Sequence, residues 1–276
     1  MLKRIKILSD ESVVEIFSCL AEHGFSAYIE TTEGCYLWDT GRGDVIIRNA
    51  YALDVDLSKL DAIVLSHGHY DHTGGLEQVL KITGPIDVYA HPGIFEKKWL
   101  ITKNSKIDIS NPFSKERLEE LGARFQYTTE PTQLSATIWV TGQIKRHTGI
   151  ESADSNLYVE RDGVLTNDEI LDDQAMYIVD PDGVNIILGC THSGIENTLI
   201  YISKISQSQK IKFLMGGLHL FKTEKRNILS TIEKIKKYNV DKIAVSHCTG
   251  LKSLAFFQNA FKEKFEITGV GSDYLF

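Results

Sequence analysis

The stretch Leu65-Ser66-His67-Gly68-His69-Tyr70-Asp71-His72-Thr73-Gly74-Gly75 decides both the fold and the chemistry of this chain. It places three imidazoles and one carboxylate within six residues. Such groups repel or desolvate one another when they are buried together, unless a cation satisfies them. We therefore predict a metal site in which His67 and His69 face one ion. After a further bend, Asp71 and His72 are expected to face a second ion. The alternative is a solvated, histidine-rich loop.

The residues on either side of this stretch predict its place in a fold. The apolar run 61–65 is typical of a strand that is buried on both faces. From Leu76 to Ile82, apolar residues recur at helical spacing. The cluster therefore follows a strand and precedes a helix, which is where open α/β sheets place their ligand sites.

Three more apolar runs end in small residues that are followed by a histidine. They are residues 185–190 before His192, 212–217 before His219 and 242–246 before His247. With the first cluster, six of the nine histidines lie at predicted strand ends. A shared sheet brings such ends to one edge, so we predict a single composite metal site.

These motifs resemble those of a known family. The cluster at 67–72, with Asp39-Thr40-Gly41 upstream, resembles the signature of the metallo-β-lactamase superfamily. The segments 189–195, 216–220 and 247–250 are similar to motifs of the 7,8-dihydropterin-6-methyl-4-(β-D-ribofuranosyl)aminobenzene-5′-phosphate synthase-like proteins. The resemblance covers most of the chain. It implies an α/β fold, a four-layer αββα sandwich of two similar αβ halves, formed as a single domain by residues 1–276.

The resemblance also implies further metal ligands. His247 corresponds to the last histidine of the superfamily and closes the second site, and His192 completes the first. Cys190 stands where many relatives place a bridging carboxylate, so ligation and plain packing are both open for it. Without Cys190, a bridge would have to come from Asp172 or Asp173. The predicted ligands are His67, His69, Asp71, His72, Cys190, His192 and His247.

Two other residues are candidates for contact with a substrate. His219 is interpreted as a partner of the ligands, a proton donor or a substrate contact, with a structural role as the alternative. Arg146 is the candidate for binding a carboxylate or phosphate, because its planar guanidinium group suits bidentate pairing. The synthase-like group tends to carry Gly-Glu-Ile-Pro-Arg where this chain has Gly-Gln-Ile-Lys-Arg at 142–146. What this segment contacts is therefore expected to differ here.

The segment around Arg146 belongs to the least regular part of the sequence. Residues 92–155 are interpreted as an insertion that covers the site and recognises the substrate. His147, beside Arg146, is expected either to face the substrate or to be an exposed loop residue. One helix is predicted within the insertion, at residues 114–121.

Turn and capping signals predict several other elements. Hairpins are expected around Glu33-Gly34, Asp180-Pro181-Asp182-Gly183 and Arg161-Asp162-Gly163. Ser193 and Glu196 fit a capping box at the start of a helix. A further helix is predicted at residues 223–238.

Composition excludes some partners and locations. The net charge is −7, and the largest basic block, at 234–237, fits a solvated helix face better than a nucleic-acid groove. No run approaches the ~20 apolar residues that span a bilayer, and the first ten residues do not resemble a signal peptide. The four cysteines are scattered, which favours reduced thiols in the cytoplasm.

These observations predict a cytoplasmic metal-dependent hydrolase of a small phosphorylated or carboxylated molecule. The expected cofactors are one or two divalent ions, zinc first, with iron or manganese as alternatives. Water on the metal would be the nucleophile, with Asp71 orienting it. The alternative is a transferase that joins a dihydropterin diphosphate to an aminobenzene ribofuranosyl phosphate. A second alternative is a non-catalytic metal-binding scaffold. No partner other than a small molecule is expected, and no oligomeric state is predicted.

Overall fold

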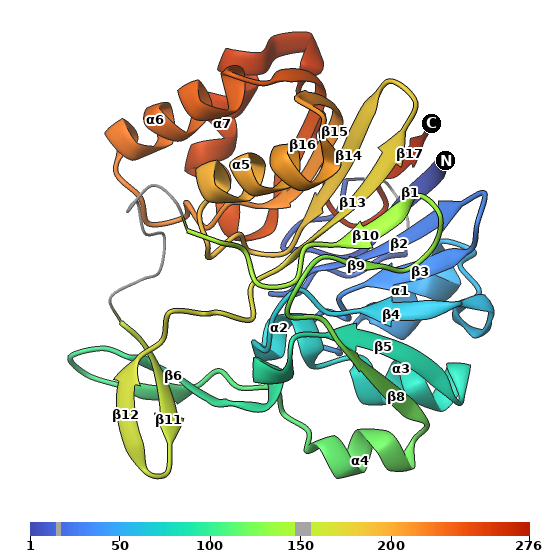
Figure 1. Ribbon diagram of the computed structural model, residues 1–276. Helices are drawn as coiled ribbons and strands as arrows, with labels where there is room; N and C mark the ends of the chain where they lie inside the picture. The colour runs from blue at the N-terminus through green and yellow to red at the C-terminus, as the bar shows by residue number, and fades with distance from the viewer. Residues whose placement is uncertain (15–17, 147–155) are drawn as a thin grey trace.

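Two mixed β-sheets pack face to face, and helices cover their outer faces (Figure 1). The computed structural model describes residues 1–14, 18–146 and 156–276. His147 and the end of the predicted insertion, up to residue 155, lie outside the described residues.

The first sheet is built by the N-terminal half of the chain and closed by its last strand. Its order is β17-β1-β2-β3-β4-β5-β8. Pairing is antiparallel from β17 to β3 and parallel from β3 to β8. The strands are β1 (Leu2–Ser9), β2 (Ser26–Thr31), β3 (Cys35–Trp38), β4 (Ala62–Val64), β5 (Ile86–Ala90), β8 (Ala123–Tyr127) and β17 (Asp273–Leu275).

The second sheet repeats this plan in the C-terminal half. Its order is β16-β15-β14-β13-β10-β9, with β14, β15 and β16 parallel and the remaining pairs antiparallel. Parallel neighbours need crossover connections, and helices provide them in both halves. The strands are β9 (Thr132–Gln133), β10 (Ile138–Val140), β13 (Ala175–Asp180), β14 (Gly183–Leu188), β15 (Lys210–Gly217) and β16 (Asn239–Ser246).

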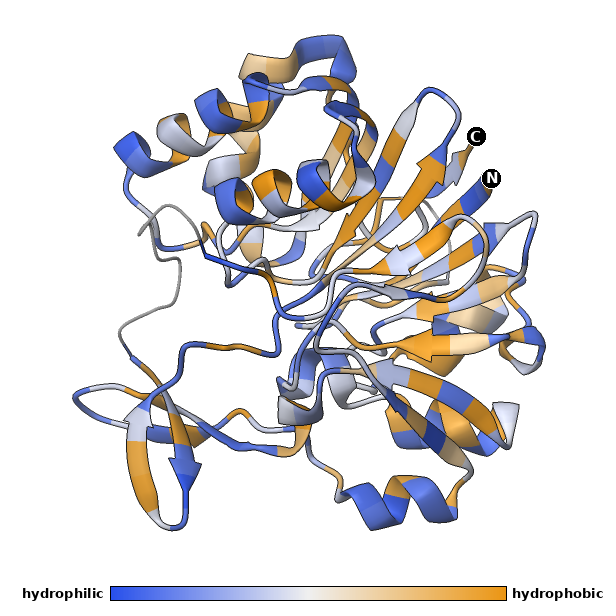
Figure 2. Cartoon of the chain, viewed as in Figure 1, coloured by the Kyte–Doolittle hydropathy of each residue, from blue (hydrophilic) through white to orange (hydrophobic). Residues whose placement is uncertain are grey.

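Three hydrophobic clusters hold the four layers together. One lies between the sheets and includes Trp38, Ile187 and Phe213. A second packs the helices α1 (Ile46–Ala52), α3 (Leu76–Thr83) and α4 (Lys115–Glu120) onto the first sheet. A third packs α5 (Ile195–Ser206), α6 (Lys225–Lys236) and α7 (Leu251–Phe261) onto the second sheet. Figure 2 shows the same division, with apolar strands inside and helices of mixed hydropathy outside. The predicted four-layer α/β sandwich is confirmed.

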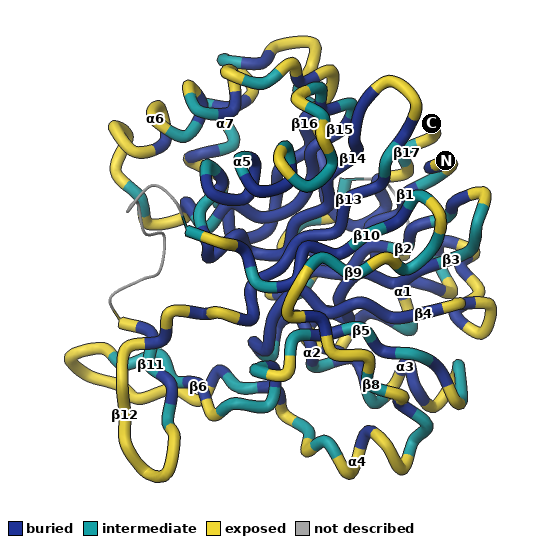
Figure 3. The backbone as a smooth tube through the Cα atoms, in the orientation of Figure 1, coloured by how far each residue is buried: buried dark blue, intermediate teal, exposed yellow. Residues whose placement is uncertain are grey.

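A third, smaller sheet stands apart from the sandwich. Its order is β12-β11-β6-β7, and it comprises β6 (Lys97–Ile101), β7 (Lys106–Asp108), β11 (Leu157–Arg161) and β12 (Val164–Asn167). Its strand β12 is exposed along its whole length, whereas the central strands of the sandwich are buried (Figure 3). We call this sheet the arm.

The segment treated above as one insertion is distributed over all three sheets. Within 92–155, β6 and β7 belong to the arm, β8 to the first sheet, and β9 and β10 to the second. Its role in substrate recognition stays a prediction. Short 3-10 helices complete the described chain: η1 (Leu57–Lys59), η2 (Pro92–Phe95), η3 (His247–Thr249) and η4 (Lys262–Lys264).

The three predicted hairpins and the helices near 114–121 and 223–238 are confirmed. The capping box at Ser193 is wrong. Gly194 is the N-cap of α5, and it has no side chain to cap the helix. Ser193 is buried instead and donates its backbone N–H to Asp173. Among the described residues, no helix is both long and apolar enough to cross a membrane.

Candidate metal centre

The histidine-rich stretch turns sharply between β4 and the short helix α2 (Tyr70–Thr73). Gly68 at this turn donates its backbone N–H to Oδ2 of Asp172, 2.7 Å away. A Cβ at Gly68 would lie 2.7 Å from the backbone of Ile94, so only glycine fits here without movement. The turn between His67 and His69 therefore packs closely against η2.

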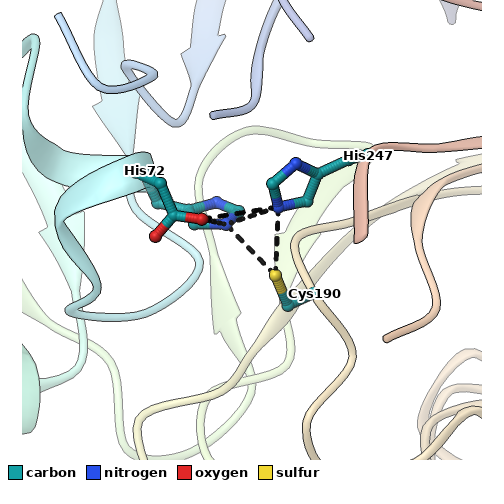
Figure 4. A group of neighbouring side chains, drawn as sticks. His72, Cys190 and His247 are labelled. Atoms are coloured by element: carbon teal, nitrogen blue, oxygen red, sulfur yellow. Dashed lines mark hydrogen bonds and ion pairs between the residues drawn. The ribbon is translucent and has the colours of Figure 1, made fainter. Parts of the chain in front are cut away.

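Asp71, His72, Cys190 and His247 form a group that we call the mixed group. The Nε2 atoms of His72 and His247 and the Sγ atom of Cys190 lie 3.2 Å from one another. Oδ2 of Asp71 lies 3.6 Å from each of those nitrogens. Figure 4 shows the side chains of His72, Cys190 and His247 directed at one another from separate segments.

These separations fit a tetrahedral cation. With Zn–N near 2.0–2.1 Å and Zn–S near 2.3 Å, neighbouring ligands of zinc lie about 3.3–3.6 Å apart, and the observed 3.2 and 3.6 Å lie close to that range. Burial raises the pKa of the Cys190 thiol well above its usual value, so a thiolate at this position needs a cation beside it. The residues of the mixed group therefore suit a zinc-like ion in both spacing and charge.

His67, His69 and His192 form the second group, which we call the three-histidine group. Nε2 of His67 lies 2.9 Å from Nδ1 of His69, and all three side chains are buried. Burial lowers the pKa of His69 to about 3 and the pKa values of His67 and His192 well below their usual range. These imidazoles are therefore neutral at pH 7, which is the form that binds a metal.

Cys190 connects the two groups. Its Sγ atom also lies within 4.8 Å of ligand atoms of His192 and His219. The thiol thus stands in the mixed group and beside a member of the three-histidine group. The structure brings all seven predicted ligands into one buried centre, while their role as ligands stays a prediction.

Asp39 holds imidazoles of both groups on their Nδ1 side, directly for His72 and through Ser66 for His67. Its Oδ2 atom accepts hydrogen bonds from Nδ1 of His72 and from the hydroxyl of Ser66, each 2.7 Å away. Because the Ser66 hydroxyl donates to Asp39, it accepts from Nδ1 of His67 at 2.9 Å. The Nε2 atoms of both histidines are then left to face the centre, as metal-binding imidazoles require.

Asp172 and Asp173 lie outside both ligand groups. Asp172 holds the Gly68 turn and pairs with Lys98, and Asp173 accepts the N–H of Ser193 at 2.8 Å. The next residue, Gln174, donates from its side chain to the carbonyl of Leu65. This loop therefore connects the two histidine motifs, and its carboxylates contact Lys98, Gly68 and Ser193 and belong to neither ligand group.

The two predicted substrate contacts lie differently. The ring of His219 is 4.4 Å from that of His192, and its side chain is half-buried at the edge of the centre. Arg146 donates a side-chain hydrogen bond to the carbonyl of Glu169, which follows β12. Four non-glycine residues at the centre have left-handed backbone: Asp39, Thr191, His219 and His247. Such strain is typical of functional sites.

Glu11, His23 and Lys98 are functional candidates that the sequence did not reveal. Glu11 and His23 adjoin His247, and the ammonium of Lys98 is buried against Asp172. The sequence analysis found candidate residues as histidines that follow an apolar run, and none of these three residues is in that position. The strand-end signal therefore could not find them.

A family model of the metallo-β-lactamase superfamily matches residues 21–247. The chain belongs to the metallo-β-lactamase superfamily. The crystal structure of Tm1679, described as a metal-dependent hydrolase of the β-lactamase superfamily, has the same fold. The two superpose with a TM-score of 0.86 and 25% sequence identity over 99% of each chain.

Two proteins of one organism are similar in sequence to this superfamily member over most of its length. It is 34% identical to the 7,8-dihydropterin-6-methyl-4-(β-D-ribofuranosyl)-aminobenzene-5′-phosphate synthase of Methanocaldococcus jannaschii. That match spans 256 residues, 89% of this chain and 87% of the synthase. An uncharacterized protein of the same organism is 35% identical over 253 residues, 91% of this chain and 92% of that protein. The expected likeness to the synthase-like proteins is confirmed.

Proposed function

We propose that the protein is a metal-dependent hydrolase of a small phosphorylated or carboxylated molecule. One observation carries the proposal: two ligand groups share one buried centre and meet at Cys190. When bound, divalent ions would lower the pKa of water and polarise a phosphoryl or carbonyl group. Zinc is the ion proposed, because a thiolate and imidazoles are its preferred ligands.

The residues around the centre have distinct tasks in this proposal. The seven predicted ligands hold the ions, and Asp39 fixes the imidazoles that face them. Asp71, whose side chain is 10% exposed, would orient the attacking water from the accessible side of the mixed group. His219 would contact the substrate or donate a proton to the leaving group, because it lies beside His192 and is half-buried. Arg146 would bind a carboxylate or phosphate of the substrate.

The second candidate is a transferase of the pterin synthase type. It is favoured by the 34% identity to the named synthase over most of both chains. Against direct transfer of that activity, the chain is equally similar to an uncharacterized protein of the same organism. The differences at Gln143 and Lys145 from the motif of the synthase-like group also favour another substrate.

One experiment separates these functions. The purified protein is incubated with a dihydropterin diphosphate, with and without the aminobenzene ribofuranosyl phosphate, and released diphosphate is measured. Release that requires the amine supports the transferase, and release in its absence supports the hydrolase. Phosphomonoesters, phosphodiesters and lactones extend the test to other hydrolase substrates. A protein that binds metal but converts none of these compounds supports the non-catalytic scaffold.

A further inference from the structure

Glu11 and His23 lie on the exposed side of the mixed group. Glu11 follows β1, and His23 precedes β2. The side chains of Glu11 and His23 are 36% and 53% exposed, whereas those of His247 and Asp71 are 0% and 10% exposed. The pair is therefore where the mixed group approaches the protein surface.

Glu11, His23, His247 and Asp71 form a closed ring of contacts. Oε1 of Glu11 lies 2.9 Å from Nδ1 of His247 and 2.7 Å from Nδ1 of His23. Nε2 of His23 lies 3.5 Å from Oδ2 of Asp71. The rings of His23 and His247 are stacked, with centroids 5.7 Å apart and planes inclined by 26°. Two predicted ligands are thus held from outside by one carboxylate and one imidazole.

We propose that Glu11 is a positioning residue of the metal centre, which acts by holding Nδ1 of His247 and Nδ1 of His23. An imidazole that donates Nδ1–H to a carboxylate has a fixed tautomer and ring orientation, which leaves Nε2 for a metal. Nε2 of His247 accordingly faces His72 and Cys190. Asp39 holds His72 in the same way, so each imidazole of the mixed group has its own carboxylate.

The contacts of Glu22 show how a structural carboxylate differs. Glu22 accepts from the Ser9 hydroxyl and from backbone N–H groups of Arg42 and Asp44, so it fastens a loop. The carboxylate of Glu11 instead faces two imidazoles, one of which is a predicted ligand. These contacts of Glu11 are those expected of a residue that orients a metal ligand.

The inference rests on the metal centre of the proposed function and not on the reaction catalysed there. It is tested with Glu11→Gln, which replaces the carboxylate by an amide with a single acceptor oxygen. Glu11→Asp is the conservative variant. Glu30→Gln is the matched control, because the Glu30 side chain is also 36% exposed but pairs with Lys3. Zinc affinity is measured by competition with a chelator, together with the absorption spectrum of the Co²⁺-substituted protein.

We expect Glu11→Gln to weaken binding of one zinc ion by about 10- to 100-fold, the usual effect of losing such a partner. The Co²⁺ bands should shift, Glu11→Asp should recover part of the affinity, and Glu30→Gln should match the parent. Thermal unfolding of the metal-free variants checks that they fold. If the parent binds zinc and Glu11→Gln leaves both the zinc affinity and the Co²⁺ spectrum unchanged, only the proposed role of Glu11 is overturned. A parent that binds no zinc overturns the metal centre as well.

Discussion

Lys98 of the arm and Asp172 beside the histidine turn form a fully buried ion pair, with Nζ and Oδ1 2.6 Å apart. The ammonium also lies 3.2 Å from Asp168, and the second oxygen of Asp172 accepts the N–H of Gly68. Backbone contacts reinforce the connection, because Tyr70 donates its N–H to the carbonyl of Ile109 at 3.1 Å. The arm is therefore fastened directly to the turn that carries His67 and His69.

Replacing Lys98 by methionine should destabilise the protein strongly. The variant leaves two buried carboxylates without their cation, and breaking a buried pair in this way costs about 3–5 kcal/mol. Urea unfolding of the metal-free protein at pH 7 measures the loss. The control is Lys97→Met, because the neighbouring Lys97 is 48% exposed and pairs with Asp108 at the surface. Its cost should stay below about 1 kcal/mol, and equal losses in the two variants would contradict the assignment.

The same pair predicts how stability depends on pH. Burial alone would raise the pKa of Asp172 and lower that of Lys98, but their mutual attraction shifts both pKa values the other way. The stabilisation is then complete between the unfolded pKa values, about 3.9 for Asp and about 10.4 for Lys. It is lost as the pH falls through the folded pKa of Asp172 or rises through that of Lys98. The difference in the free energy of unfolding between the parent and Lys98→Met should therefore be constant near neutral pH and decrease in acid. A difference that increases in acid would refute the pairing.

Cys190→Ser tests whether the thiol is a ligand. If it is, the Co²⁺-substituted parent shows a sulfur-to-metal charge-transfer band, and the variant loses the band along with zinc affinity. Cys35→Ser is the control, because the Cys35 thiol accepts a hydrogen bond from Tyr28 and belongs to neither ligand group. An intact band in Cys190→Ser would leave Cys190 a packing residue.

The two ligand groups should load with metal in sequence. The mixed group offers a carboxylate and a thiol, whereas the other group offers three neutral imidazoles. Once a cation is beside them and His247 and Cys190 have lost their protons, Asp71 and Cys190 both carry negative charge, so Coulomb attraction favours the mixed group for the first divalent ion. A chelator should remove one equivalent readily and the second slowly, as followed by elemental analysis. His67→Ala should lack the labile ion and His247→Ala the tight one. Loss of the tight ion from His67→Ala would reverse the order.

The sequence predicted the elements that have a recognisable local sequence pattern. Turn signals predicted the hairpins, and apolar runs that end near histidines predicted that the seven candidate ligands lie together. The capping prediction at Ser193 was wrong because Ser193 is buried. Its backbone N–H donates to Asp173, twenty residues earlier in the chain. Glu11 and Lys98 were missed for a similar reason. Each becomes important through a partner far along the chain, His247 or Asp172, and no local pattern encodes that contact.

The mixed group takes Asp71 and His72 from the first half of the chain and Cys190 and His247 from the second. An ion held there would be a removable cross-link between the halves, comparable in its topology to a disulfide. A chain cut once between Asp71 and Cys190 would keep a tether across the two sheets for as long as the ion stayed bound. Removing the ion from such a cut chain would leave the two halves joined by noncovalent contacts such as the packing between the sheets.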